Sequence, residues 1–172
     1  MKLLSSVLLG VLLTIFAIAV VGYIFILTGH MPMATAAGAL PGEEAIAKMA
    51  LRASYKDSVD LKNPLPLNDE NLKGGADVYT GNCAMCHGAL DQKRPDLATA
   101  MYPHAPELLR GTGVTDDPEG ETYWKVTNGI RMTGMPAFNN ILDEKRRWQV
   151  TMLVAHADKL TPAARKQLLG PQ

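Results

Sequence analysis

The feature that most constrains this chain is a five-residue motif, Cys83-Ala84-Met85-Cys86-His87. It contains both cysteines of the chain, so no disulfide framework can link distant segments. The spacing is that of c-type haem attachment, in which two thiols add to the haem vinyl groups and the adjacent imidazole reaches the iron. A zinc site would need a second cysteine pair, and a dithiol redox motif would need a βαβ context. The motif therefore predicts one haem c, covalently bound through Cys83 and Cys86, with His87 as an iron ligand.

The N-terminal segment predicts a membrane anchor. Residues 3–27 carry no charge, and as a helix they would extend about 37 Å against a hydrocarbon core of about 30 Å. A cleaved signal is the alternative, because small residues at 34–37 offer a cleavage site, but its apolar region is normally about 7 to 15 residues. Lys2 precedes the segment and Glu43 is the first charge after it. This asymmetry predicts a single pass with a cytoplasmic N-terminus and the remaining chain on the periplasmic side of the inner membrane.

Composition excludes several function classes. The 172 residues suffice for one compact domain with some extra chain, which excludes a large multidomain enzyme. Lys plus Arg and Asp plus Glu are both 17, so there is no basic field to attract nucleic acid. Neither a paired-carboxylate motif nor a nucleophile elbow is visible, so we expect no catalytic residue and no small-molecule substrate.

The chain is predicted to have three regions, an anchor at 1–28, an extracytoplasmic tether at 29–67 and a haem domain at 68–172. Within the tether, residues 28–42 hold Gly, Pro and small residues without an apolar period, as an extended spacer does. Residues 43–57 have the pattern of a short amphipathic helix. This helix is expected to lie on the haem domain or in solvent, with docking on a partner subunit as the alternative.

Apolar residues at helical spacing predict three further helices, over 69–82, 118–128 and 143–159. The first and last are natural packing partners, because Gly75 leaves a bare patch on the first helix. Trp124 on the middle helix is expected to face inward. The expected fold class is therefore all-α.

The chain resembles the membrane-anchored monohaem cytochromes c of the class I fold over roughly residues 60–160. The resemblance is carried by PLPLNDENLKGGADVYTGNCAMCHG, MYPHAPEL, YWKVTNGIRMTGMPAF and RWQV. It implies an N-terminal transmembrane helix followed by a small haem domain of about three to five helices. It also implies that the iron is bound by His87 of the CxxCH motif and by Met135 of the Gly-Met-Pro-Ala segment. A neutral thioether ligand favours the reduced ion.

Other side chains compete with Met135 for the second axial position. Met132 lies three residues earlier in the same segment, whereas Pro136 stiffens the chain beside Met135. His104 and His156 are further alternatives. We prefer Met135, because a methionine between Gly and Pro in a loop is harder to explain as core than a histidine is as surface.

The remaining haem contacts follow from the same resemblance. In the family, the second ring nitrogen of the haem-binding histidine is held by the carbonyl of a Pro-x-Leu segment. This chain offers Pro95 and Pro106, and the neighbouring residues match better around Pro106. Three further side chains are candidates to contact the haem face or its propionates, with core or surface positions as the alternative: Tyr102, Trp124 and Arg131.

These features together predict a membrane-tethered one-electron carrier of a respiratory chain, whose partners are the membrane and other redox proteins. One alternative is a cytochrome subunit held in a larger oxidase or dehydrogenase complex. Another is a haem enzyme in which Met135 leaves the iron. Six-coordinate iron would offer no open position for chemistry, so we expect electron transfer rather than catalysis.

Overall fold

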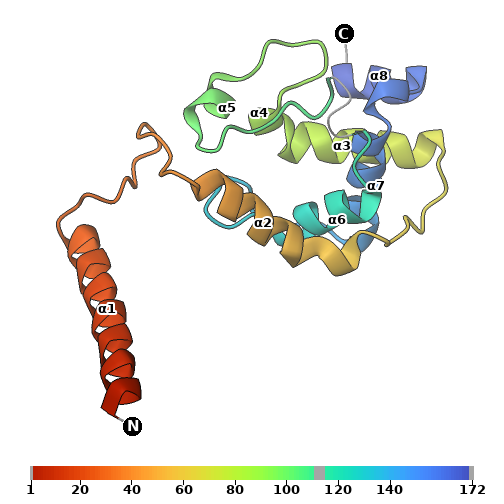
Figure 1. Ribbon diagram of the computed structural model, residues 1–172. Helices are drawn as coiled ribbons and strands as arrows, with labels where there is room; N and C mark the ends of the chain where they lie inside the picture. Colours follow the sequence, from red (N-terminus) through yellow and green to blue (C-terminus); the bar gives the residue numbers. More distant parts are fainter. Residues whose placement is uncertain (1, 111–114, 171–172) are drawn as a thin grey trace. The chain divides into compact units, whose positions relative to one another are not determined.

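The computed structural model describes residues 2–110 and 115–170 (Figure 1). Every regular element among these residues is a helix, which confirms the all-α class. The chain divides into two compact units, one ending at Pro41 and the other beginning at Gly42.

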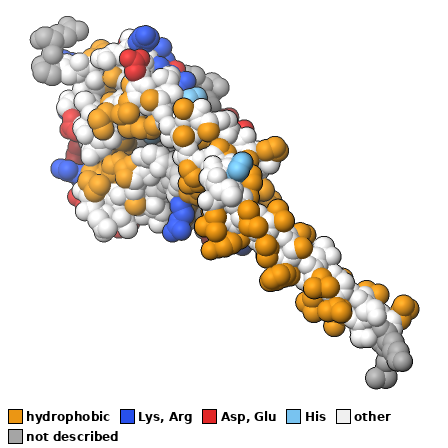
Figure 2. All heavy atoms as spheres, turned by 90° about the vertical axis from the view of Figure 1, so that its left-hand side faces the viewer, with side chains coloured by type: hydrophobic (Ala, Val, Ile, Leu, Met, Phe, Trp, Pro, Cys, Tyr) orange, Lys and Arg blue, Asp and Glu red, His pale blue; other side chains and the backbone are white. Residues whose placement is uncertain are grey.

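The first unit consists of α1 (Lys2–Leu27) and the segment that follows it. Residues 3–27 form a helix long and apolar enough to cross a membrane, and Figure 2 shows hydrophobic side chains along its length. The hydroxyls of Thr14 and Thr28 donate to the carbonyls of Gly10 and Ile24, four residues earlier, so each hydroxyl has a backbone acceptor in α1. Some N-terminal signal sequences also reach this length and apolar composition.

The second unit begins with α2 (Glu43–Tyr55) and a 3₁₀ turn, η1 (Lys56–Ser58). Two long helices of this unit, α3 (Asp69–Asn82) and α7 (Glu144–Ala155), cross each other, and α8 (Pro162–Leu169) packs on α3. The buried apolar side chains that these three helices contribute to one core cluster are Leu72, Ala76, Val78, Tyr79, Val150, Met152, Leu153, Val154, Ala164 and Leu168. They form the hydrophobic core around which the rest of the unit is arranged.

Side-chain caps fix where the core helices start. The side chain of Asn68 accepts the Asn71 N–H at 2.9 Å, and Asp143 accepts the Arg146 N–H at 2.8 Å. Each satisfies one of the backbone donors that a helix leaves free at its first turn. The expected starts of these two helices are thereby reproduced to within one residue. The last expected helix is shorter than its pattern, because α7 ends at Ala155 and Ala157–Lys159 form the 3₁₀ turn η2.

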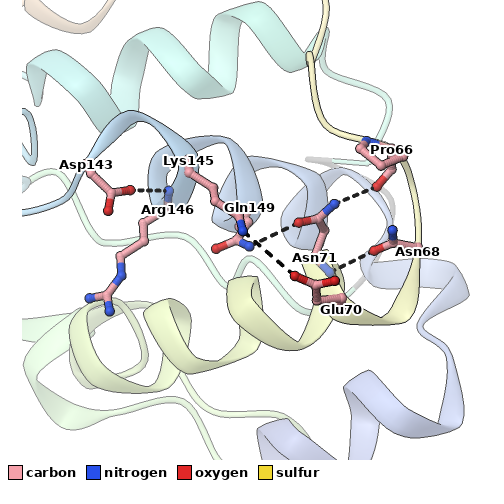
Figure 3. A network of polar contacts seen from close by, with 8 residues as sticks. All are labelled: Pro66, Asn68, Glu70, Asn71, Asp143, Lys145, Arg146 and Gln149. Atoms are coloured by element: carbon pink, nitrogen blue, oxygen red, sulfur yellow. Dashed lines mark hydrogen bonds and ion pairs between the residues drawn. The ribbon is translucent and has the colours of Figure 1, made fainter.

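A buried polar network sets the register between α3 and α7 (Figure 3). Gln149 donates to the Asn71 side-chain oxygen at 3.1 Å, and Asn71 donates to the Pro66 carbonyl at 2.9 Å. Both side chains are buried, and a buried polar group left without a partner costs about 1–3 kcal/mol. Sliding one helix along the other would break this chain of bonds, so the network favours a single alignment.

Three shorter helices complete the second unit: α4 (Ala84–His87), α5 (Asp96–Ala100) and α6 (Glu119–Asn128). The expected middle helix is thus observed as α6, which packs on α7 through Tyr123. The Tyr123 ring stacks on Trp148 at 3.8 Å between ring centroids. Trp124 points elsewhere: it is half-buried and lies against Tyr55 of α2 at 6.2 Å.

The close crossing of α3 and α7 predicts that Gly75 is indispensable. A β-carbon at Gly75 would overlap with the backbone carbonyl of Gln149, whereas one at Gly81 of the same helix would meet nothing within 4 Å. Gly75→Ala should lower the free energy of unfolding by about 1–3 kcal/mol through overpacking. Gly81→Ala, the matched control, should be neutral or stabilise by up to about 1 kcal/mol. Urea unfolding of the two variants checks this, and equal stabilities would contradict the crossing.

Candidate functional site

The junction of α3 and α4 places the two cysteines and the histidine together. The Cys83 N–H donates to the Tyr79 carbonyl at 2.8 Å and so caps α3 just after its last residue, Asn82. The chain then makes one further helical turn, α4, in which the His87 N–H donates to the Cys83 carbonyl at 2.8 Å. Cys83, Cys86 and His87 consequently line one cavity. Two thiols and an imidazole on a single rigid turn are the groups that covalent haem attachment requires.

Burial controls the chemistry of the free Cys83 thiol. Removal from water raises the pKa of Cys83 to about 12, because the thiolate is the form that loses hydration. The thiol is therefore protonated at neutral pH and a poor nucleophile in the folded chain. A buried thiol of this kind is also protected from disulfide exchange.

The His87 imidazole is held by the backbone of a distant segment. Its Nδ1 lies 2.8 Å from the Pro106 carbonyl oxygen. A carbonyl can only accept, so Nδ1 carries the proton and the neutral ring has its lone pair on Nε2. Burial lowers the pKa of His87, with the Pro106 carbonyl opposing this effect. The neutral ring is the form that binds a metal ion, and the bond to Pro106 fixes its orientation.

The competing proline is engaged elsewhere. The Pro95 carbonyl accepts the Ala98 N–H at 3.1 Å, as part of the first turn of α5. The segment before Pro106 is fixed by Arg94, whose guanidinium donates to the Ala105 carbonyl at 2.7 Å. Of the two Pro-x-Leu segments, the structure brings the one at Pro106 to His87.

Tyr79 supports the turn that follows the motif. Its hydroxyl donates to the Gly88 carbonyl at 2.7 Å, and its side chain is fully buried. Burial raises the pKa of Tyr79, so the hydroxyl remains a donor at any ordinary pH. Gly88 has φ +87°, a backbone conformation that favours glycine. The chain thus leaves α4 in one fixed direction.

Met135 reaches the same cavity from the loop after α6. Its carbonyl accepts the Ile130 N–H at 3.2 Å and its own N–H donates to the Thr133 hydroxyl at 3.1 Å. The loop starts at Gly129, where φ is +66° and a β-carbon would lie 2.6 Å from the Ala137 nitrogen. The Met135 side chain is half-buried and lines the cavity with His87.

The alternatives to Met135 lie in different surroundings. Met132 is 80% exposed and does not line the cavity. His156 is also outside it, with Nδ1 2.9 Å from the Met152 carbonyl oxygen. His104 does line the cavity, but its Nδ1 is 2.7 Å from the Met101 carbonyl oxygen and its side chain is exposed. Among the candidates named from the sequence, Met135 is the partly buried thioether that faces the cavity.

The cavity itself has a volume of about 380 Å³ and mainly apolar walls. Its wall side chains from α6, α7 and the intervening loop include Val126, Phe138, Val150 and Val154. An apolar slot that carries two thiols, one imidazole with a free Nε2 and one thioether fits a covalently attached haem. The group would complete the core on this side of α3 and α7.

The three side chains expected at the haem face are not among the residues that line the cavity. The side chain of Tyr102 is 36% exposed and that of Arg131 is also exposed. Trp124 packs on Tyr55. The reason for Trp124 is helical geometry, since Thr122, Lys125 and Val126 occupy the face of α6 that the cavity borders.

Sequence reasoning missed several lining residues, among them Leu51, Met101, Asp117 and Lys125. Met101 stands directly before Tyr102 in the segment MYPHAPEL, and its sulfur lies 3.0 Å from the place of a β-carbon on Gly134. Lys125 lies three residues after Thr122 on one face of a helix. Helical spacing therefore places these two lining residues together. Leu51 lies in a segment far from the motif and carried no such signal.

Comparison with known proteins agrees with this geometry. Residues 72–158, half of the chain, match the family described as cytochrome c. The chain is also similar to cytochrome c6 of Diacronema lutheri, with 31% identity over 74 residues, or 43% of this chain and 81% of that protein. No solved structure matches. The match covers the motif, the cavity walls from α6 and α7 and the Met135 loop, and the chain belongs to the cytochrome c family, whose domain implies haem c and electron transfer.

Proposed function

We propose that the protein is a membrane-tethered one-electron carrier with one haem c, attached through Cys83 and Cys86 and ligated by His87 and Met135. The single observation that carries this proposal is the convergence of these four side chains, from two segments about 50 residues apart, on one apolar cavity. Family membership supports electron transfer in general. The particular ligands and the tether are the further content of the proposal.

The protein side chains would set the properties of the bound group, which supplies a reversible one-electron couple of the iron. His87 would be presented with Nε2 free, because Nδ1–H donates to the Pro106 carbonyl. The apolar side chains of Val126, Val150 and Val154 would exclude water. A neutral thioether and a dry cavity both favour the less charged, reduced state.

The location of the protein is part of the same proposal. α1 supplies a span of sufficient length, and the charges on either side of it favour a cytoplasmic N-terminus. The haem domain would then lie on the periplasmic side of the inner membrane and exchange electrons with proteins of a respiratory chain.

A second candidate is a fixed subunit of a larger redox complex. Ile46 and Met49 of α2 are 64% and 66% exposed, so this helix presents apolar side chains to its surroundings. Such side chains suit a lasting contact with another subunit. Native electrophoresis of a detergent extract would distinguish a free carrier from a complex.

The first test is covalent attachment. Haem should stay with the protein on a denaturing gel, because thioether bonds survive unfolding and axial bonds do not. Cys83→Ala together with Cys86→Ala should release the colour into acidified organic solvent. Extraction of haem from the unmodified protein would contradict attachment through the cysteines.

The second test concerns Met135. With its sulfur on the iron, the oxidised protein should show a weak far-red absorption, and the reduced form should resist carbon monoxide. Met135→Ala should abolish the band and allow carbon monoxide to bind, whereas Met132→Ala should leave both properties unchanged because Met132 is exposed. Loss of the band only in the Met132 variant would reverse the assignment.

The third test is retention in the membrane. The protein should remain in the pellet after alkaline or high-salt washing, because an apolar span resists both treatments. Membrane fractions probed for haem would show this. Release into the soluble fraction, with a new N-terminus near residue 37, would instead establish a cleaved signal.

A further inference from the structure

A helix outside the residues that match the family contributes to the wall of the cavity. The family match begins at residue 72, whereas Leu51 of α2 lines the cavity together with Cys83, His87 and Met135. Leu51 is half-buried, while its neighbours on the other faces of α2 are exposed. α2 therefore turns one apolar side chain toward the site that the family domain builds.

Tyr55, at the end of α2, attaches this helix to α6. Its side chain is 9% exposed, and its ring lies 6.2 Å from that of Trp124. The ammonium of Lys125 lies 5.5 Å from the centre of the Tyr55 ring, within cation–π range. Trp124 and Lys125 are adjacent on α6, so Tyr55 packs against two consecutive side chains of the helix that borders the cavity.

A second contact between backbones lies one turn earlier on α6. A β-carbon on Gly120 would overlap with the Ser58 carbonyl of η1 and would lie 3.0 Å from the Val59 carbonyl oxygen. Gly120 is buried. The absence of a side chain at this position lets η1 approach the start of α6 as closely as it does.

An ionic cluster lies where the Tyr55 contact meets the cavity. The Lys125 ammonium is 2.5 Å from a Glu121 carboxylate oxygen and 3.7 Å from one of Asp117. Lys125 and Asp117 both line the cavity. Burial raises the pKa of Asp117, and the Lys125 charge opposes this effect. The charged groups of this cluster are thus partly buried, and they lie at the edge of the cavity that α2 also lines.

We propose that α2 and η1 form a cover over the haem cavity, seated by Tyr55 and Gly120, through which Leu51 shields the haem from water and raises its reduction potential. This inference rests on the proposed function, because it assigns positioning residues to the same cavity. Water stabilises the more highly charged oxidised state. Removing the cover should therefore lower the potential without removing any axial ligand.

Two variants of the full-length haem protein test the cover. Leu51→Asn places a neutral polar group at the cavity wall, and Met49→Asn is the matched control on an exposed face of the same helix. Gly120→Ala places a methyl group where the Ser58 carbonyl of η1 lies, at a position that does not line the cavity. Because alanine is a better helix former than glycine, the substitution does not weaken α6 itself. Variants at two separate positions, Leu51 and Gly120, thus test the same contact of α2 and η1 with the haem domain.

The first measurement is tryptic cleavage after Lys56 and Lys62, followed by mass spectrometry. Both variants should be cleaved about tenfold faster than the unmodified protein and Met49→Asn, because an undocked segment opens more often. The second is redox titration. Both variants should shift the one-electron equilibrium about tenfold toward the oxidised form, which corresponds to about 59 mV.

The far-red band of the iron–sulfur bond should persist in all variants, which separates loss of the cover from loss of a ligand. Cleavage rates and potentials equal to those of Met49→Asn would overturn the cover. Faster cleavage at an unchanged potential would overturn the role of Leu51 in shielding the haem. A chain without covalent haem would instead refute the proposed function, and the cleavage rates would still report whether α2 docks.

Discussion

The crossing of α3 and α7 is the contact on which the rest of the second unit depends. Gly75 lets the two backbones approach, and the buried bond between Asn71 and Gln149 fixes their register. The cysteine motif continues directly from the end of α3, while Val150 and Val154 of α7 line the same cavity. A shift of one helix along the other would therefore move the attachment turn relative to this part of the cavity wall.

The cavity is built by loops as much as by helices. The carbonyl of Pro106 and the side chain of Met135 both come from segments without regular structure. These segments are held by specific bonds, the Arg94 guanidinium on the Ala105 carbonyl and the Met135 carbonyl on the Ile130 N–H. Loops held in this way on a helical scaffold can present binding residues. The apolar volume between them is of the kind that a haem would fill, which relates cofactor binding to stability.

Several side chains show where sequence patterns reach their limit. Trp124 was expected to face inward, yet it packs on Tyr55, and its neighbour Tyr123 stacks on Trp148. Adjacent residues on a helix point about 100° apart, so the choice between them depends on which helix lies alongside. The packing of α2 and α7 against α6 decides which aromatic side chain contacts which helix. The spacing of apolar residues in α6 does not indicate it.

The sequence alone indicated α1, α2, α3, α6 and α7 and the chemistry of the site, whereas it did not indicate α5 or α8. Apolar spacing and capping residues such as Asn68 and Asp143 act over a few residues, and the CxxCH motif needs only one helical turn. Only the tertiary structure decided which distant groups meet that turn. It brought the Pro106 carbonyl to His87, turned Met135 inward and Met132 outward, and added Leu51 to the wall. These choices depend on how chain segments far apart in the sequence pack together, because contacts of that kind leave no local pattern of spacing.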